Sequence, residues 1–217
     1  MSKVQTLLFD FDYTLADSSS AIVKCANHAL AGLGFEVVSP HAIHRTIGLS
    51  LADTFVALVG EQHRPREAEF RVLWRELSNQ IMADETYMLP DVVETLVLFR
   101  ERGLKLGIVS TKFRSKIEKV LLREGITELF DAVVGGDDVP RHKPHPDGIY
   151  KALNHLNSIP HKTVYVGDSA VDAMAAASAE LQFIAVLSGV TEVSEFAAYK
   201  PRAIIRCLKE LSQIISP

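Results

Sequence analysis

Two aspartates, Asp10 and Asp12, end an apolar run near the start of the chain, in the stretch LLFDFDYTL at residues 7–15. Carboxylates at this spacing could attack an electrophile, exchange protons with a substrate or hold a hard cation such as Mg²⁺. An Asp-x-Asp pair is a weak signal alone, and its simplest interpretation is a solvated turn after a strand. Its meaning therefore depends on which other polar groups the fold brings to the same place.

Further polar residues follow other short apolar runs in the same way. They are Ser110, Thr111 and Lys112 after residues 104–109, Asp137 and Asp138 after 132–135, Lys143 in the next loop, and Asp168, Ser169 and Asp172 after 163–167. In an open parallel sheet, ligands bind beyond the carboxyl ends of the strands. We therefore expect carboxylates, a hydroxyl group and an ammonium group to converge on one edge of the sheet.

The elements that position these groups alternate in type along the chain. Short apolar runs lie at 4–9, 104–109, 132–135, 163–167 and 183–187, and amphipathic patterns with helix start and stop signals lie between them. Runs that are apolar on successive residues are typical of strands buried on both faces. The alternation predicts an α/β fold with a doubly wound, Rossmann-like parallel sheet.

Residues 16–88 interrupt this alternation, because they contain helical patterns and no convincing strand. We therefore expect an α-helical cap domain at 16–88, inserted into a catalytic core domain formed by 1–15 and 89–217. A stripe that includes Phe70 and Trp74 is most simply explained as packing within the insert.

Composition restricts the function classes. The 217 residues carry a net charge of −4, with no basic block that would indicate nucleic acid and no apolar stretch long enough for a membrane span. Cys25 and Cys207 are far apart in sequence and are expected to be reduced thiols. We expect a cytoplasmic protein that is a monomer or a weak homodimer and whose partner is a small molecule.

The order of the motifs carries the most information. DFDYT, then ST, then KP, then GDSAVD, each just after a strand-like run, resembles the haloacid dehalogenase superfamily of phosphohydrolases over nearly the whole chain. The helical insert after the first motif is similar to the small cap domain of that superfamily. The resemblance implies a Mg²⁺-dependent phosphatase that acts on a small phosphorylated metabolite through an aspartyl-phosphate intermediate.

The same resemblance implies a role for each motif residue. Asp10 is the expected nucleophile, and Asp12 the general acid and base, which points to a phosphate ester or anhydride because a halide leaving group needs no proton. The remaining expected roles are Mg²⁺ binding by Asp10, the Asp12 backbone carbonyl and Asp168, phosphoryl binding by Ser110 and Thr111, and charge neutralisation by Lys143. Thr14 is expected to form a hydrogen bond near the nucleophile loop, and Asp172 to support the metal shell or to anchor Lys143.

The cap is expected to recognise the leaving group through Gly48, Leu49 and Ser50, in a loop similar to that of bacterial phosphoglycolate phosphatases and a related pyrophosphatase, and through residues 17–20 just after the first motif. 2-Phosphoglycolate is the leading candidate. Pyrophosphate, nucleotide monophosphates and sugar phosphates stay open. A phosphomutase is disfavoured by Leu51, where such enzymes usually carry arginine. A non-catalytic, receiver-like module is disfavoured by the acid-base residue Asp12, which such a module does not need.

Tyr13 departs from the resemblance, because the superfamily most often has glycine at this position. A tyrosine predicts that the turn does not require a backbone conformation that favours glycine. It also predicts that the ring lies beside the site or under the cap, where it would shape the substrate pocket.

Overall fold

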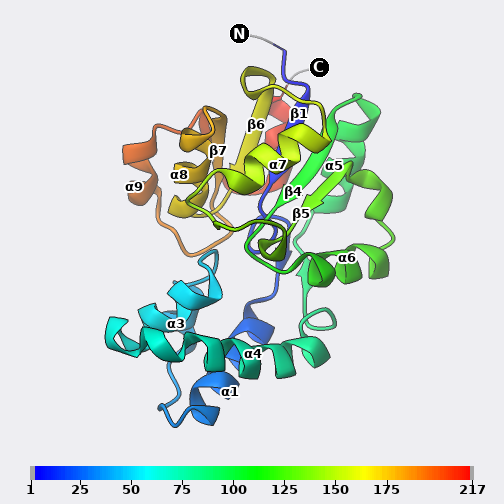
Figure 1. Cartoon of the computed structure of the whole chain (residues 1–217). Coiled ribbons are helices and arrows are strands. Elements are labelled where there is room, and N and C mark those ends of the chain that lie inside the picture. Colours follow the sequence, from blue (N-terminus) through cyan, green and yellow to red (C-terminus); the bar gives the residue numbers. More distant parts are fainter. Residues whose placement is uncertain (1–2, 216–217) are drawn as a thin grey trace.

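The centre of the computed structural model, which describes residues 3–215, is a six-stranded parallel sheet (Figure 1). The strands are β1 (Thr6–Phe9), β4 (Lys105–Val109), β5 (Ala132–Val134), β6 (Thr163–Gly167), β7 (Gln182–Val186) and β8 (Ala203–Ile205). Their order across the sheet is β5-β4-β1-β6-β7-β8. The chain winds outward on one side of β1 and then on the other, so the predicted doubly wound α/β class is confirmed. The carboxyl ends of β1, β4 and β6 adjoin at the switch point, where ligands bind in such sheets.

Helices cover both faces of the sheet. Packed on one face are α5 (Val92–Glu101), α6 (Arg114–Arg123) and α10 (Leu211–Ile214), and on the other α7 (Asp147–His155), α8 (Ala170–Ser178) and α9 (Val193–Phe196). Successive residues of β1 divide between the two cores, because side chains alternate along a strand: Leu7 and Phe9 face the first set of helices and Leu8 the second. This double burial explains the unbroken apolar runs in the sequence.

Short 3₁₀ turns occur in the connections of this part of the chain. They are η2 (Thr127–Leu129), η3 (Gly136–Asp138), η4 (Pro160–Lys162), η5 (Ala197–Tyr199) and η6 (Leu208–Glu210). The edge strand β8 was not predicted, because three residues of apolar sequence are too short to identify a strand.

Residues 18–86 form a helical layer that we call the helical cap. Its elements are α1 (Ser19–Gly32), α2 (Pro40–His44), α3 (Leu51–Val59), η1 (Glu61–Arg66) and α4 (Glu67–Ile81). Two short antiparallel strands, β2 (Ala16–Asp17) and β3 (Tyr87–Met88), join it to the sheet. The expectation that 16–88 contains no strand is therefore wrong at its two ends, where two-residue strands are too short to leave an alternating pattern.

The helical cap has an apolar core of its own. Phe55 stacks on Phe70 with ring centroids 4.9 Å apart, and Phe70 contacts Trp74 at 5.7 Å. These rings are buried with the apolar side of α1, as the stripe in the sequence predicts. The hydroxyl group of Ser39 caps α2 by accepting from the Ala42 amide, and Pro40 occupies the first position of the helix.

The helical cap lies beyond the carboxyl ends of the strands, at the opposite end of the molecule from both chain termini (Figure 1). Arg45 of the cap contacts helix α9 of the sheet domain through two hydrogen bonds to Glu195, of 3.1 and 3.0 Å. None of the helices within residues 3–215 has both the length and the apolar character that crossing a bilayer would require.

Candidate active site

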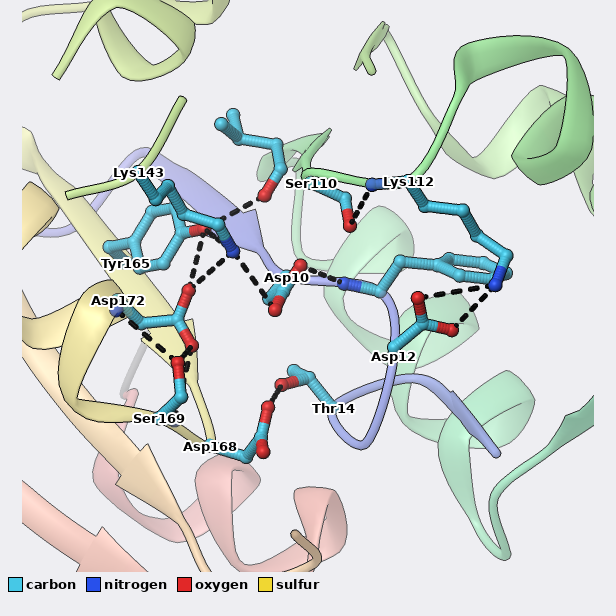
Figure 2. Close-up of polar contacts among 12 residues, drawn as sticks. Asp10, Asp12, Thr14, Ser110, Lys112, Lys143, Tyr165, Asp168, Ser169 and Asp172 are labelled. Carbon is cyan, nitrogen blue, oxygen red and sulfur yellow. Dashed lines mark hydrogen bonds and ion pairs between the residues drawn. The ribbon is translucent and has the colours of Figure 1, made fainter. Parts of the chain in front are cut away.

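The turn after β1 determines the directions in which the Asp10 and Asp12 side chains point. The Asp10 amide is the last to join the sheet, donating to the Val166 carbonyl at 3.0 Å, and the chain then folds back so that the Leu15 amide donates to the Phe11 carbonyl at 2.9 Å. Phe11 is fully buried in the core. Because Phe11 anchors the turn, the two aspartates on either side of it emerge at the sheet edge in different directions (Figure 2).

Tyr13 adopts a left-handed backbone conformation, with φ of 59°. The prediction that this turn avoids a conformation favouring glycine is therefore wrong, and the tyrosine adopts it at a cost of about 1–2 kcal/mol. The ring is buried under the cap, in edge contact with His44 at 6.3 Å. It does not line the cavity between cap and sheet, so its predicted contact with substrate stays a prediction without support from this geometry.

A buried cation links two of the predicted acids. The Lys143 ammonium group lies 2.9 Å from Asp10 and 2.5 Å from Asp172, and it also contacts the Tyr165 hydroxyl group at 3.3 Å (Figure 2). The Tyr165 hydroxyl group in turn donates to the Val109 carbonyl at 2.8 Å. Sequence reasoning missed Tyr165, because an aromatic residue inside an apolar strand is normally part of the core.

Burial and charge compete in this network. Burial raises the pKa of Asp10 to about 6, although Lys143 opposes the shift. Burial would lower the pKa of Lys143, but the carboxylates of Asp10 and Asp172 raise it well above its usual range. Lys143 therefore stays charged at neutral pH and holds Asp10 in place as an anion.

Asp172 is held in one orientation by the start of α8. Its carboxylate accepts from the Ser169 amide at 3.1 Å and from the Ser169 hydroxyl group at 2.5 Å, while Ser169 caps the helix. Of the two roles expected for Asp172, support of the metal shell and anchoring of Lys143, the structure brings the second into direct contact.

Asp168 lies at the end of β6 and is the second candidate metal ligand. It accepts from the Thr14 hydroxyl group at 3.2 Å, which places Thr14 next to the acidic cluster, as expected. Burial raises the pKa of Asp168 well above its usual range, and the nearby charges of Asp172 and Asp10 raise it further. A Cβ at Gly189 would lie 2.0 Å from an Asp168 carboxylate oxygen, so a larger residue there would force the Asp168 side chain to move.

The acidic cluster fits a divalent cation. Carboxylate oxygens of Asp10, Asp168 and Asp172 all lie within 4.8 Å of one another, and all three residues are buried. Carboxylate oxygens suit a hard ion such as Mg²⁺. The raised pKa values of Asp10 and Asp168 indicate the same fit, because a cation would relieve the destabilisation of two buried anions.

Ser110 and Thr111 follow β4, beside the acidic cluster. The Ser110 amide completes the sheet by donating to Val134 at 3.0 Å, and its hydroxyl group, which accepts from the Lys112 amide at 3.3 Å, faces Asp10 (Figure 2). Thr111 lines the cavity between cap and sheet. Both residues therefore lie beside the position in front of Asp10 where the expected phosphoryl group would bind.

Asp12 points away from the acidic cluster and has its own cation. The Lys112 ammonium group lies 2.9 Å from one Asp12 oxygen and 3.2 Å from the other, and the Ser18 hydroxyl group also donates to Asp12. Lys112 was seen in the sequence at the end of β4 but received no role, and Ser18 was not singled out as an individual residue. Lys112 and Asp12 are 100 positions apart in the sequence, so local spacing does not predict their ion pair.

The loop of the helical cap that carries Gly48, Leu49 and Ser50 lies next to the site. Gly48 has φ of 98°, and a Cβ there would lie 3.5 Å from the Ser169 hydroxyl oxygen, so this glycine is needed for conformation and sits close above the core. Gly48 and Leu49 line the cavity, and their expected contact with the leaving group stays a prediction. Ser50 does not line it. The Ser50 hydroxyl group instead caps α3 by accepting from the Asp53 amide at 3.1 Å.

The fold is an open parallel α/β sheet of Rossmann-like type, with buried acids at its switch point and an inserted helical layer next to them. The family model for haloacid dehalogenase-like hydrolases matches residues 7–186. The chain therefore belongs to the haloacid dehalogenase-like hydrolase family, and it is an enzyme of the phosphatase class within it. This confirms the resemblance found in the sequence.

Relatives over the full length support the same assignment. A protein named pyrophosphatase PpaX from Bacillus pumilus is 30% identical over 99% of this chain and 97% of its own. The crystal structure of a haloacid dehalogenase-like hydrolase from Bacteroides fragilis is 39% identical, with a TM-score of 0.93 over 96% of this chain and 100% of the other. A structure named as a predicted phosphoglycolate phosphatase from Haemophilus somnus covers all of both chains with a TM-score of 0.87. At 24% identity it supports the fold alone.

Proposed function

We propose that this enzyme is a Mg²⁺-dependent phosphatase that hydrolyses a small phosphomonoester through an aspartyl-phosphate on Asp10. The observation that carries the proposal is the separation of the two aspartates of the first motif. Asp10 is paired with Lys143, and Asp12 is paired with Lys112. Two carboxylates in different environments suit two different roles in one reaction.

In the first half of the reaction, an oxygen of Asp10 attacks phosphorus and the bond from phosphorus to the leaving oxygen breaks. Asp10 is oriented for this by the Phe11 amide at 2.7 Å and by Lys143. The leaving oxygen takes a proton from Asp12, which must be protonated at that stage.

In the second half, Asp12 removes a proton from a water molecule, which attacks the aspartyl-phosphate and releases inorganic phosphate. The carboxylate form that Lys112 stabilises is the form this step needs. Asp10 and Asp168, with Asp172 beside them, would hold the Mg²⁺ ion, which supplies positive charge to the transferring phosphoryl group when bound.

For the substrate we propose 2-phosphoglycolate first, because of the likeness of the cap loop, and pyrophosphate second, because relatives 30% identical over nearly the whole chain are named as pyrophosphatases. We further propose that residues 16–88 act as a cap domain on a core of 1–15 and 89–217. The separate apolar core of the cap supports this division. Cytoplasmic location is part of the same proposal and rests on the sequence.

Asp10→Asn tests the proposal. We expect it to abolish phosphate release from a panel of phosphorylated metabolites, since it removes the nucleophile, while wild-type activity requires Mg²⁺ and is lost in EDTA. Asp137→Asn is the matched control, because Asp137 is an exposed acid at the same edge that caps α6 through the Arg114 amide. Retained hydrolysis by a folded Asp10→Asn protein would refute the assignment, and isomer formation without phosphate release would indicate a mutase.

A further inference from the structure

A cavity of about 70 Å³ lies between the helical cap and the core, next to Asp12. Its apolar wall includes Ile22, Leu51 and Trp74. A water molecule needs about 10–15 Å³ of such space, so the cavity offers roughly five to seven water-sized positions. This is room for a group of about five non-hydrogen atoms.

Lys116, on α6, lines this cavity and is 6% exposed. Its ammonium group donates to the Asn79 side chain at 2.6 Å. Within residues 3–215, no carboxylate lies at ion-pairing distance from it, and an ammonium group has three donors to satisfy. Lys143 and Lys112, the other lysines at the site, are each paired with an aspartate.

The surroundings of Lys116 are electropositive. Burial lowers the pKa of its ammonium group, and the charges of Lys119 and Lys112 lower it further. A buried cation without a counter-charge is costly, and an anion in the cavity would remove that cost. The apolar wall strengthens the attraction, because it excludes water from around the charges.

We propose that Lys116 binds a negative charge on the leaving group, so that this enzyme selects small phosphorylated substrates whose leaving group is itself an anion. The inference rests on the proposed function and extends it. As the bond from phosphorus breaks, the leaving oxygen takes its proton from Asp12, and the carboxylate or phosphate at the other end of the leaving group meets the Lys116 ammonium group. Glycolate and inorganic phosphate, with five non-hydrogen atoms each, both fit this description.

The test compares substrates that differ in the charge of the leaving group. For Lys116→Met we expect kcat/KM to fall roughly 10- to 100-fold with 2-phosphoglycolate or pyrophosphate, the range that loss of a charged hydrogen bond gives. With ethyl phosphate, whose leaving group is neutral, we expect a change of less than about twofold, because Lys116 would have no charge to bind. Lys119→Met, an exposed lysine one turn along α6, is the matched control.

An equal loss on all three substrates would show a structural role for Lys116 and overturn the inference, as would no loss on any. If Lys116→Met does not fold, Lys116→Gln keeps a partner for Asn79 and serves the same comparison. A binding measurement separates this inference from the proposed function: calorimetric titration of Asp10→Asn with pyrophosphate in the absence of added metal, with and without Lys116→Met. Equal affinities overturn the role of Lys116 even in an active phosphatase, whereas weaker binding upholds it even if the wild type releases no phosphate.

Discussion

Binding of Mg²⁺ should weaken sharply between pH 7.5 and pH 5, because the metal and protons compete for the same buried carboxylates. The pKa of Asp10 is raised to about 6, so the group is almost fully ionised at pH 7.5 and only about 9% ionised at pH 5. The apparent Kd for Mg²⁺ should therefore rise roughly 11-fold at pH 5, or about 1.4 kcal/mol, from Asp10 alone. Asp168, whose pKa is also raised, adds to this loss.

Mg²⁺ affinity should rise with pH, whereas the free energy of unfolding of the metal-free protein should fall with pH. Asp10 has a higher pKa in the folded protein than its usual 3.8, so the folded state binds more protons than the unfolded state between about pH 4 and pH 6. Without metal, the free energy of unfolding should therefore fall as pH rises through this range, by about 3 kcal/mol from Asp10. Lys143 stays protonated throughout and contributes no change.

Calorimetric titration with MgCl₂ at the two pH values, at constant ionic strength, measures the change in affinity. Thermal unfolding gives an independent readout. At a Mg²⁺ concentration ten times the Kd found at pH 7.5, stabilisation should be about 1.4 kcal/mol at pH 7.5 and about 0.4 kcal/mol at pH 5.

Two variants make this prediction specific. Asp10→Asn should lose most of the Mg²⁺ affinity and the part of its pH dependence that comes from Asp10, since the amide neither carries charge nor titrates. The control Asp137→Asn should behave as the wild type does. Equal Mg²⁺ affinity at both pH values, or full affinity in Asp10→Asn, would refute the placement of the ion at this cluster.

Two further predictions concern the cap side of the site. Tyr13→Gly relieves the left-handed backbone but removes a buried ring, so the free energy of unfolding, measured with urea, should fall by about 1–2 kcal/mol. Because Tyr13 does not line the cavity, the ranking of substrates should not change, and a changed ranking would contradict this. Glu195→Gln weakens the exposed pair with Arg45, so kcat/KM should change less than about threefold, and not at all in about 0.5 M NaCl. A tenfold change that persists in high salt would show that the pair controls cap closure.

The convergence of the acids could be predicted because it depends on strand type alone. Parallel strands end at the same edge of a sheet, so each residue after a buried strand is delivered there. Asp10, Ser110 and Asp168 meet for this reason, and no detail of packing is needed. The loop that carries Lys143 was predicted at the same edge, but its reach to Asp10 depends on the helix α8 that holds Asp172.

Features that depend on contacts between segments distant in sequence could not be predicted. The strands β2 and β3 are two residues each and exist because the two connections to the cap run side by side. The conformation of Tyr13 is imposed by the folded turn and its partners, including the Ser188 hydroxyl group that donates to its carbonyl. A propensity argument from tyrosine alone gives the opposite answer.

Three lysines divide the site into parts with different electrostatics. Lys143 is paired with Asp10 and Lys112 with Asp12, whereas Lys116 has no carboxylate at ion-pairing distance within residues 3–215. A substrate with one charge would satisfy the first site alone, whereas a substrate with a second negative charge about one leaving group away would satisfy the last as well. The arrangement therefore explains how one pocket could accept both a phosphorylated carboxylic acid and pyrophosphate, since their leaving groups share size and charge.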